Sequence, residues 1–76
     1  MSEHGGQTVQ LRDTSIKLGQ FLKLADLVDT GADAKALLAQ GLVRVNGDIE
    51  TRRGRQLVDG DVVELAGRRA VVSTRS

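Results

Sequence analysis

The chain contains no cysteine and no proline, and Phe21 is its only aromatic residue. Without cysteine it can form neither a disulfide nor a thiolate-metal site, and its single histidine, His4, lies in the polar opening segment. We therefore expect no metal, no cofactor and no histidine-based catalytic triad. Modules that read unpaired bases usually stack them on exposed aromatic rings. A protein without a spare ring would instead have to recognise a nucleic acid by its backbone and shape.

Long hydrophobic runs are also missing. No apolar stretch approaches the roughly 20 residues that span a bilayer, and the opening residues MSEHGGQT lack the basic and apolar regions of a signal peptide. A chain of 76 residues forms one small domain at most. We expect a soluble, cytoplasmic monomer with a flexible tail over residues 1–8 and a single domain over residues 9–74. The acids show no paired-carboxylate pattern, so we expect neither enzymatic activity nor a small-molecule substrate.

Charge is balanced overall but unevenly placed, with a formal net charge of +1. Residues 1–40 carry four cations and five acids, whereas residues 41–76 carry seven arginines and five acids. Within the second half, the run Thr51-Arg52-Arg53-Gly54-Arg55-Gln56 contains three arginines and no acid. A local basic cluster in a balanced chain indicates an anionic partner. The alternative is a charged loop that is merely solvated.

Two helices are predicted from local signals. The apolar residues between 18 and 25 follow the i, i+3, i+4, i+7 spacing of one helical face: Leu18, Phe21, Leu22 and Ala25. A second helix is predicted up to Gln40. It begins after Thr30, whose hydroxyl can accept a hydrogen bond from the amide of Asp33. Gly41 then favours the positive φ that ends a helix.

The rest of the chain predicts short strands joined by tight turns. Strands are expected over residues 8–11, 43–45, 62–65 and 70–72. Turns are expected at Asn46-Gly47, at 59–61 and at 66–69, and residues 49–57 form an arm that contains the arginines. The fold class is therefore α+β, with two short helices packed on a small, mostly antiparallel sheet. The expected core consists of Phe21, Leu22, Leu37, Leu38, Val43, Val45, Val63 and Leu65.

Several short motifs follow one another at suggestive distances. They are Lys17-Leu18, Thr30, Ala34-Lys35, Val43-Arg44-Val45-Asn46-Gly47 and Gly60-Asp61-Val62-Val63. In this order, over about residues 16–66, they resemble the RNA-binding domain named after ribosomal protein S4, or α-L motif, whose pattern reads approximately R-L-D-x-x-L, S/T-R-x-x-A-R, G-x-V-x-V-N-G and G-D-x-V. The run from Ile16 to Lys23, with Arg52-Arg53-Gly54-Arg55, is similar to the small stand-alone bacterial S4-like proteins of the YaaA/YbcJ type. The resemblance implies binding of structured RNA, such as ribosomal or transfer RNA.

The sequence departs from that pattern at two positions. Gly19 stands in place of the aspartate of R-L-D, and Gly31 in place of the arginine that follows the capping residue, which leaves Lys35 as the only cation of the second helix. Because lysine lacks the planar fork of arginine, we expect the binding face to shift partly toward the arginine cluster, forming one concave surface. The predicted RNA-binding residues are Lys17, Lys35, Arg44, Arg52, Arg53 and Arg55.

Two other functions stay open at this point. A duplex-DNA-binding module is disfavoured because the second helix carries little hydrogen-bonding chemistry with which to read a major groove. A protein-interaction adaptor could use the same arginines against an acidic partner. The remaining cations, Lys23, Arg68, Arg69 and Arg75, are assigned mainly to solubility, with Arg68-Arg69 at the tip of a turn.

Overall fold

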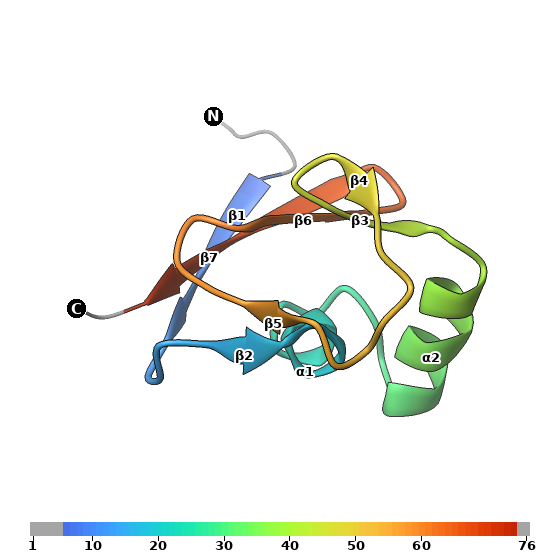
Figure 1. Ribbon diagram of the computed structural model, residues 1–76, viewed down its shortest axis with the longest axis horizontal. Helices are drawn as coiled ribbons and strands as arrows, with labels where there is room; N and C mark the ends of the chain where they lie inside the picture. The colour runs from blue at the N-terminus through green and yellow to red at the C-terminus, as the bar shows by residue number, and fades with distance from the viewer. Residues whose placement is uncertain (1–5, 75–76) are drawn as a thin grey trace.

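In the computed structural model, which describes residues 6–74, two short helices lie on one side of a five-stranded sheet (Figure 1). The elements are β1 (Gly6–Leu11), β2 (Ile16–Lys17), α1 (Leu18–Leu24), α2 (Gly31–Ala39), β3 (Val43–Val45), β4 (Asp48–Ile49), β5 (Gln56–Leu57), β6 (Val62–Leu65) and β7 (Arg68–Thr74). The sheet order is β1-β7-β6-β3-β4, and β2 pairs with β5 in a separate ribbon. Among the strands of residues 6–74, only β1 and β7 pair in parallel. The predicted α+β class is confirmed.

Helix α1 buries the predicted apolar face, which includes Leu18, Phe21 and Leu22. Burying each of these side chains contributes about 2 kcal/mol. The helix ends at Leu24, one residue earlier than predicted, because Asp26 has a φ of 60° and turns the chain in the left-handed sense. Within residues 6–74 no helix is long and apolar enough to cross a membrane.

Helix α2 begins and ends on the predicted signals. The hydroxyl of Thr30 accepts a hydrogen bond from the amide of Asp33 at 3.1 Å. Gly41, with a φ of 73°, follows the helix and reverses the chain toward β3. These local signals decide the helix because its packed face is narrow: only Ala34 and Leu38 are buried along it.

The core lies between the helices and the sheet. Alternation along β3, β6 and β7 points every second side chain toward the helices. The buried residues of these three strands are Val43, Val45, Val63, Leu65, Ala70 and Val72. Of the eight predicted core residues, seven are buried, and the exception is Leu37, which is only partly buried against the cluster.

Two predicted boundaries are wrong. Residues 6–8, expected in a flexible tail, form the first part of β1, while residues 1–5 of that expected tail lie outside the described range. Arg68 and Arg69 are not at a turn tip but begin β7. The turn is limited to Ala66-Gly67, whose φ values of 53° and 79° suit a two-residue hairpin. The last strand, β7, is therefore longer than predicted. All residues of β1 pair with it, from Gly6 opposite Arg69 to Leu11 opposite Thr74.

Candidate nucleic-acid interface

The arginine loop, residues 50–55, is docked onto the start of α1. The amide of Leu18 donates to the carbonyl of Arg55 at 2.8 Å, and the amide of Gly19 donates to the carbonyl of Arg53 at 3.0 Å. The first amides of a helix have no partner within it, so the loop satisfies donors that the helix leaves unpaired. The pairing of β2 with β5 lies directly beside these bonds. The main chain of the loop is thereby held against α1.

Gly19 accompanies this close approach. A Cβ at position 19 would stand 3.5 Å from both the Cβ and the Cγ of Arg53, which is ordinary van der Waals contact. An alanine would therefore fit, but the longer aspartate of the R-L-D pattern would compete with Arg53 for the same space. The first departure from the family pattern thus goes together with the placement of Arg53 across the start of α1.

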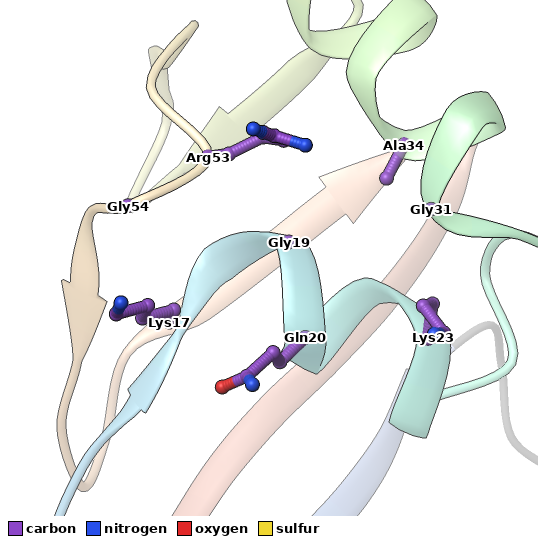
Figure 2. A pocket seen from close by; sticks show the side chains of 8 residues that line it. All are labelled: Lys17, Gly19, Gln20, Lys23, Gly31, Ala34, Arg53 and Gly54. Atoms are coloured by element: carbon purple, nitrogen blue, oxygen red, sulfur yellow. The ribbon is translucent and has the colours of Figure 1, made fainter.

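Beside Arg53 the surface is hollowed between α1, the start of α2 and the arginine loop (Figure 2). This cationic hollow has a volume of about 310 Å³. It is lined by Lys17, Gly19, Gln20, Lys23, Gly31, Ala34, Arg53 and Gly54. In Figure 2, Arg53 extends from the loop toward α2, while Lys17 lies at the start of α1 and Lys23 near its end. All three charged side chains of the lining are therefore cations.

These cations are not neutralised by neighbouring acids. Among residues 6–74, no carboxylate oxygen lies within 4.0 Å of a side-chain nitrogen of Lys17, Lys23 or Arg53. A concave surface that is lined by charges of one sign raises the local concentration of the opposite ions, here anions. The hollow can therefore attract a polyanion through uncompensated charge.

Lys35 extends the same surface along α2. It lies four residues after Gly31, and residues four apart on a helix lie one above the other on the same flank. Because Gly31 lines the cationic hollow, Lys35 lies beside the hollow, one turn further along the same flank of α2. The structure thus brings Lys17, Lys35 and Arg53 of the predicted set to one side of the molecule.

Arg52 and Arg55 have a different environment, because both contact Glu50. Glu50 is buried, with 6% of its surface exposed. Its Oε2 accepts from Nε of Arg52 at 3.0 Å, and its Oε1 accepts from Nη2 of Arg52 and from Nη1 of Arg55, both at 3.1 Å. The amides of Thr51 and Arg52 also donate to Oε2, each at 3.0 Å. One carboxylate therefore partly neutralises two of the three arginines predicted to bind RNA.

These contacts change the acidity of Glu50. The side-chain hydrogen bonds from Arg52, followed by the bond from the Arg52 amide, lower the pKa of Glu50 from 4.5 to about 2, although burial acts in the opposite direction. A carboxylate with so low a pKa is a very weak base at neutral pH. Glu50 is suited to hold the loop and not to transfer protons.

We expect the stability contributed by Glu50 to disappear in acid. Its pKa is about 2 in the folded protein against 4.5 for the unperturbed group, so the unfolded chain binds the proton first as pH falls. The contribution is complete above about pH 4.5 and is lost progressively toward pH 2. Thermal unfolding of the wild type and of Glu50→Gln from pH 7 to pH 2 checks this. The difference between the two melting temperatures should be widest at pH 7 and should narrow progressively from about pH 4.5 toward pH 2. A constant difference would contradict the assignment.

Arg44 does not share the cationic hollow. On β3 it alternates with the buried Val43 and Val45, so it points to the sheet face opposite the helices. There it pairs in register with Glu64 of β6, and its Nη1 donates to the carbonyl of Gly47 at 3.1 Å. The expectation that Arg44, Lys35 and the arginine loop form one concave surface is therefore wrong for Arg44.

Lys23 was missed by the sequence reasoning, which assigned it to solubility. Lys17, Gln20 and Lys23 are three residues apart, and such residues share one helical face. All three line the cationic hollow. The spacing of these three residues can be read from the sequence. The sequence does not, however, predict that the arginine loop docks beside this helical face.

Asn46 and Asp61, which belong to two of the motifs that carry the S4 resemblance, have a structural role. The side-chain amide of Asn46 donates to Oδ1 of Asp61 at 3.0 Å, and its Oδ1 accepts from the amide of Val62 at 2.9 Å. Oδ2 of Asp61 also accepts from the amide of Val58 at 2.9 Å. The two motifs therefore tie the β3–β4 turn to the entrance of β6, and neither residue lines the hollow.

Comparison with known proteins identifies relatives of this protein. A family model described as S4 domain matches residues 9–73. The probable ribosome maturation protein RlbA of Bacillus subtilis is 54% identical over 52 residues, which cover 68% of this chain and 73% of that protein. The putative RNA-binding protein YbcJ of Escherichia coli is 40% identical over 52 residues, which cover 68% of this chain and 74% of that protein.

Solved structures agree with these relatives. The solution structure of Escherichia coli YbcJ, described as having an α-L motif involved in RNA-binding, is similar with a TM-score of 0.67 and 33% identity, over 96% of this chain and 91% of that one. The 30S ribosomal protein S4e from Thermoplasma acidophilum is similar with a TM-score of 0.58 and 29% identity, over 76% of this chain and 31% of that one. The resemblance predicted from the motifs is thus confirmed, and the chain belongs to the S4 domain family.

Proposed function

We propose that this S4-domain protein binds structured RNA, and that phosphates of the RNA backbone occupy the cationic hollow. The observation that carries the proposal is that Lys17, Lys23 and Arg53 line one hollow whose lining contains no acid. Lys35 on the adjoining flank of α2 and the exposed side of Arg52 extend the contact. Arg55, more deeply placed, acts mainly through the loop.

Recognition follows the backbone and the shape of the RNA. The lining of the hollow contains no aromatic side chain on which a base could stack. Phosphate contacts position a protein on a nucleic acid without reading its sequence. The similarity to RlbA, a probable ribosome maturation protein, supports ribosomal RNA as the partner, and we propose a cytoplasmic location with it. We propose binding, as a monomer, and not catalysis as the activity.

The experiment that tests this function compares a stem-loop RNA with duplex DNA of equal length at matched salt. We expect tighter binding to the RNA and, with four to five phosphate contacts, a log-log salt slope of about −3.6 to −4.5. Tighter binding to the DNA would favour a DNA-binding module instead. Binding to neither nucleic acid would overturn the proposal in favour of a protein adaptor.

Restoring the missing arginine of the family pattern should tighten RNA binding. No atom lies within 4 Å of a Cβ built on Gly31, so Gly31→Arg adds a cation beside the hollow without a clash. Gly31 is the first residue of α2, so the expected effect on stability is the cost of a cation near a helix N-terminus, about 0.3–1 kcal/mol. We expect affinity to rise about tenfold and the salt slope to steepen by about 0.9.

The matched control for this gain is Ala32→Arg. It adds the same charge at the next residue of α2, which is exposed and points about 100° away around the helix. Fluorescence anisotropy with a labelled stem-loop measures both variants. An equal gain from Ala32→Arg would show that net charge, and not the hollow, governs affinity.

A further inference from the structure

The arginine loop contains three guanidinium groups within four residues, and they do not share one environment. Arg53 lines the cationic hollow, without an ion-pair partner among residues 6–74. Arg52 and Arg55 both contact the buried Glu50, and their side chains are 73% and 32% exposed. The bonds to α1 hold the main chain of the loop, but three neighbouring cationic side chains repel one another unless an anion lies among them.

Glu50 supplies that anion from inside the protein. Its two oxygens accept five hydrogen bonds, three from guanidinium nitrogens and two from main-chain amides of the loop. Arg52 is held through two of its nitrogens, so its orientation is fixed as well as its position. Arg55, whose side chain is less exposed than that of Arg52, binds the same carboxylate. The main-chain carbonyls of Arg53 and Arg55 are bound in turn by the start of α1.

We infer that Glu50 is a positioning residue of the RNA-binding surface: its buried carboxylate holds the arginine loop in the shape that presents Arg53 to the cationic hollow before RNA arrives. This inference rests on the proposed function. Without Glu50, ordering of the loop would have to accompany RNA binding, and the free energy of that ordering would be subtracted from affinity. Glu50 does not contact the RNA.

The inference makes a prediction opposite to that of simple electrostatics. Removing an acid from the neighbourhood of an RNA-binding surface raises the local positive potential and, on charge alone, should tighten binding. Removing Glu50 should weaken binding instead, because the loop loses its internal partner. The sign of the change therefore separates positioning from charge.

Glu50→Gln is the informative variant because it keeps the shape of the side chain. Its amide nitrogen is a donor and would face the donors of Arg52, so it cannot replace the carboxylate. The matched control is Asp48→Asn, which makes the same change of charge two residues away. Asp48 is exposed on β4 and makes no side-chain hydrogen bond or ion pair among the described residues. Glu50→Asp, which keeps the charge but shortens the side chain, serves as a second variant if Glu50→Gln does not fold.

Affinity for the stem-loop RNA is measured at a temperature where each variant is folded, over a series of salt concentrations. We expect Glu50→Gln to bind about tenfold more weakly than the wild type, with a salt slope shallower by about one phosphate contact, or 0.9. Asp48→Asn should bind as tightly as the wild type or slightly more tightly. Glu50→Asp should weaken binding although the net charge is unchanged. Hydrogen exchange of the Thr51 and Arg52 amides should accelerate in both Glu50 variants.

The positioning role is overturned if Glu50→Gln binds as tightly as Asp48→Asn while Arg53→Ala still weakens binding. The proposed function itself fails differently. In that case the wild type shows no salt-dependent RNA binding, or Arg53→Ala binds as well as the wild type.

Discussion

The double variant Lys17→Ala with Arg53→Ala is expected to bind RNA about 100-fold more weakly than the wild type. Each side chain lines the cationic hollow, Lys17 from the end of β2 and Arg53 from the arginine loop (Figure 2). A hydrogen bond to a charged group contributes about 1.5 kcal/mol at the lower end of its range, and two such losses correspond to about 100-fold in Kd. The salt slope should become shallower by about 1.8.

This loss should be uniform across RNA sequences and should not reflect unfolding. Both side chains are exposed and without an ion-pair partner within residues 6–74, and such substitutions usually change stability by less than about 0.5 kcal/mol each. The matched control is Arg44→Ala with Arg69→Ala, which removes the same charge from the open face of the sheet. A similar loss in that control would mean that charge acts from anywhere on the surface. A loss confined to one RNA sequence would mean that bases are read.

Asn46→Ala is expected to lower stability by about 2–3 kcal/mol, which for a domain of this size corresponds to a fall in Tm of roughly 10–20 °C. The substitution removes the bonds to Asp61 and to the amide of Val62, at about 1 kcal/mol each. It also places alanine at a φ of 53°, a left-handed conformation that costs a further 1 kcal/mol or so.

Asn46→Gly separates the two causes. Glycine adopts the left-handed conformation without strain, so this variant loses the hydrogen bonds alone and should melt between Asn46→Ala and the wild type. RNA affinity at low temperature should be unchanged in both variants, because Asn46 does not line the hollow. Equal melting temperatures for wild type and Asn46→Ala would refute the structural role given to this motif residue.

The sequence was most informative where structure is decided locally. The helical spacing from Leu18 to Ala25, the cap at Thr30 and the turn at Asn46-Gly47 each depend on residues within a few positions of one another, and each appears as predicted. The parallel pairing of β1 with β7 depends on residues about 60 positions apart and has no local signature. The docking of the arginine loop on α1 is a long-range contact of the same kind.

The candidate site shows the same division. Counting arginines drew attention to the loop, but a count treats Arg52, Arg53 and Arg55 as equivalent, whereas the buried Glu50 distinguishes them. Alternation correctly turned Arg44 away from the core. The error was to predict that the sheet face of Arg44 forms one surface with Lys35, because the helices cover the opposite face of the sheet (Figure 1). Burial of an acid and the side on which helices pack are properties of the whole fold.

The parallel pairing of β1 with β7 also has a consequence for synthesis of the chain. A ribosome makes Gly6–Leu11 early, yet that strand finds its neighbour only when Arg68–Thr74 has emerged. Until then β1 and β6 both lack the strand that lies between them in the finished sheet. Closure of the sheet is therefore a later step than formation of α1 and α2, which can form before β7 has been made.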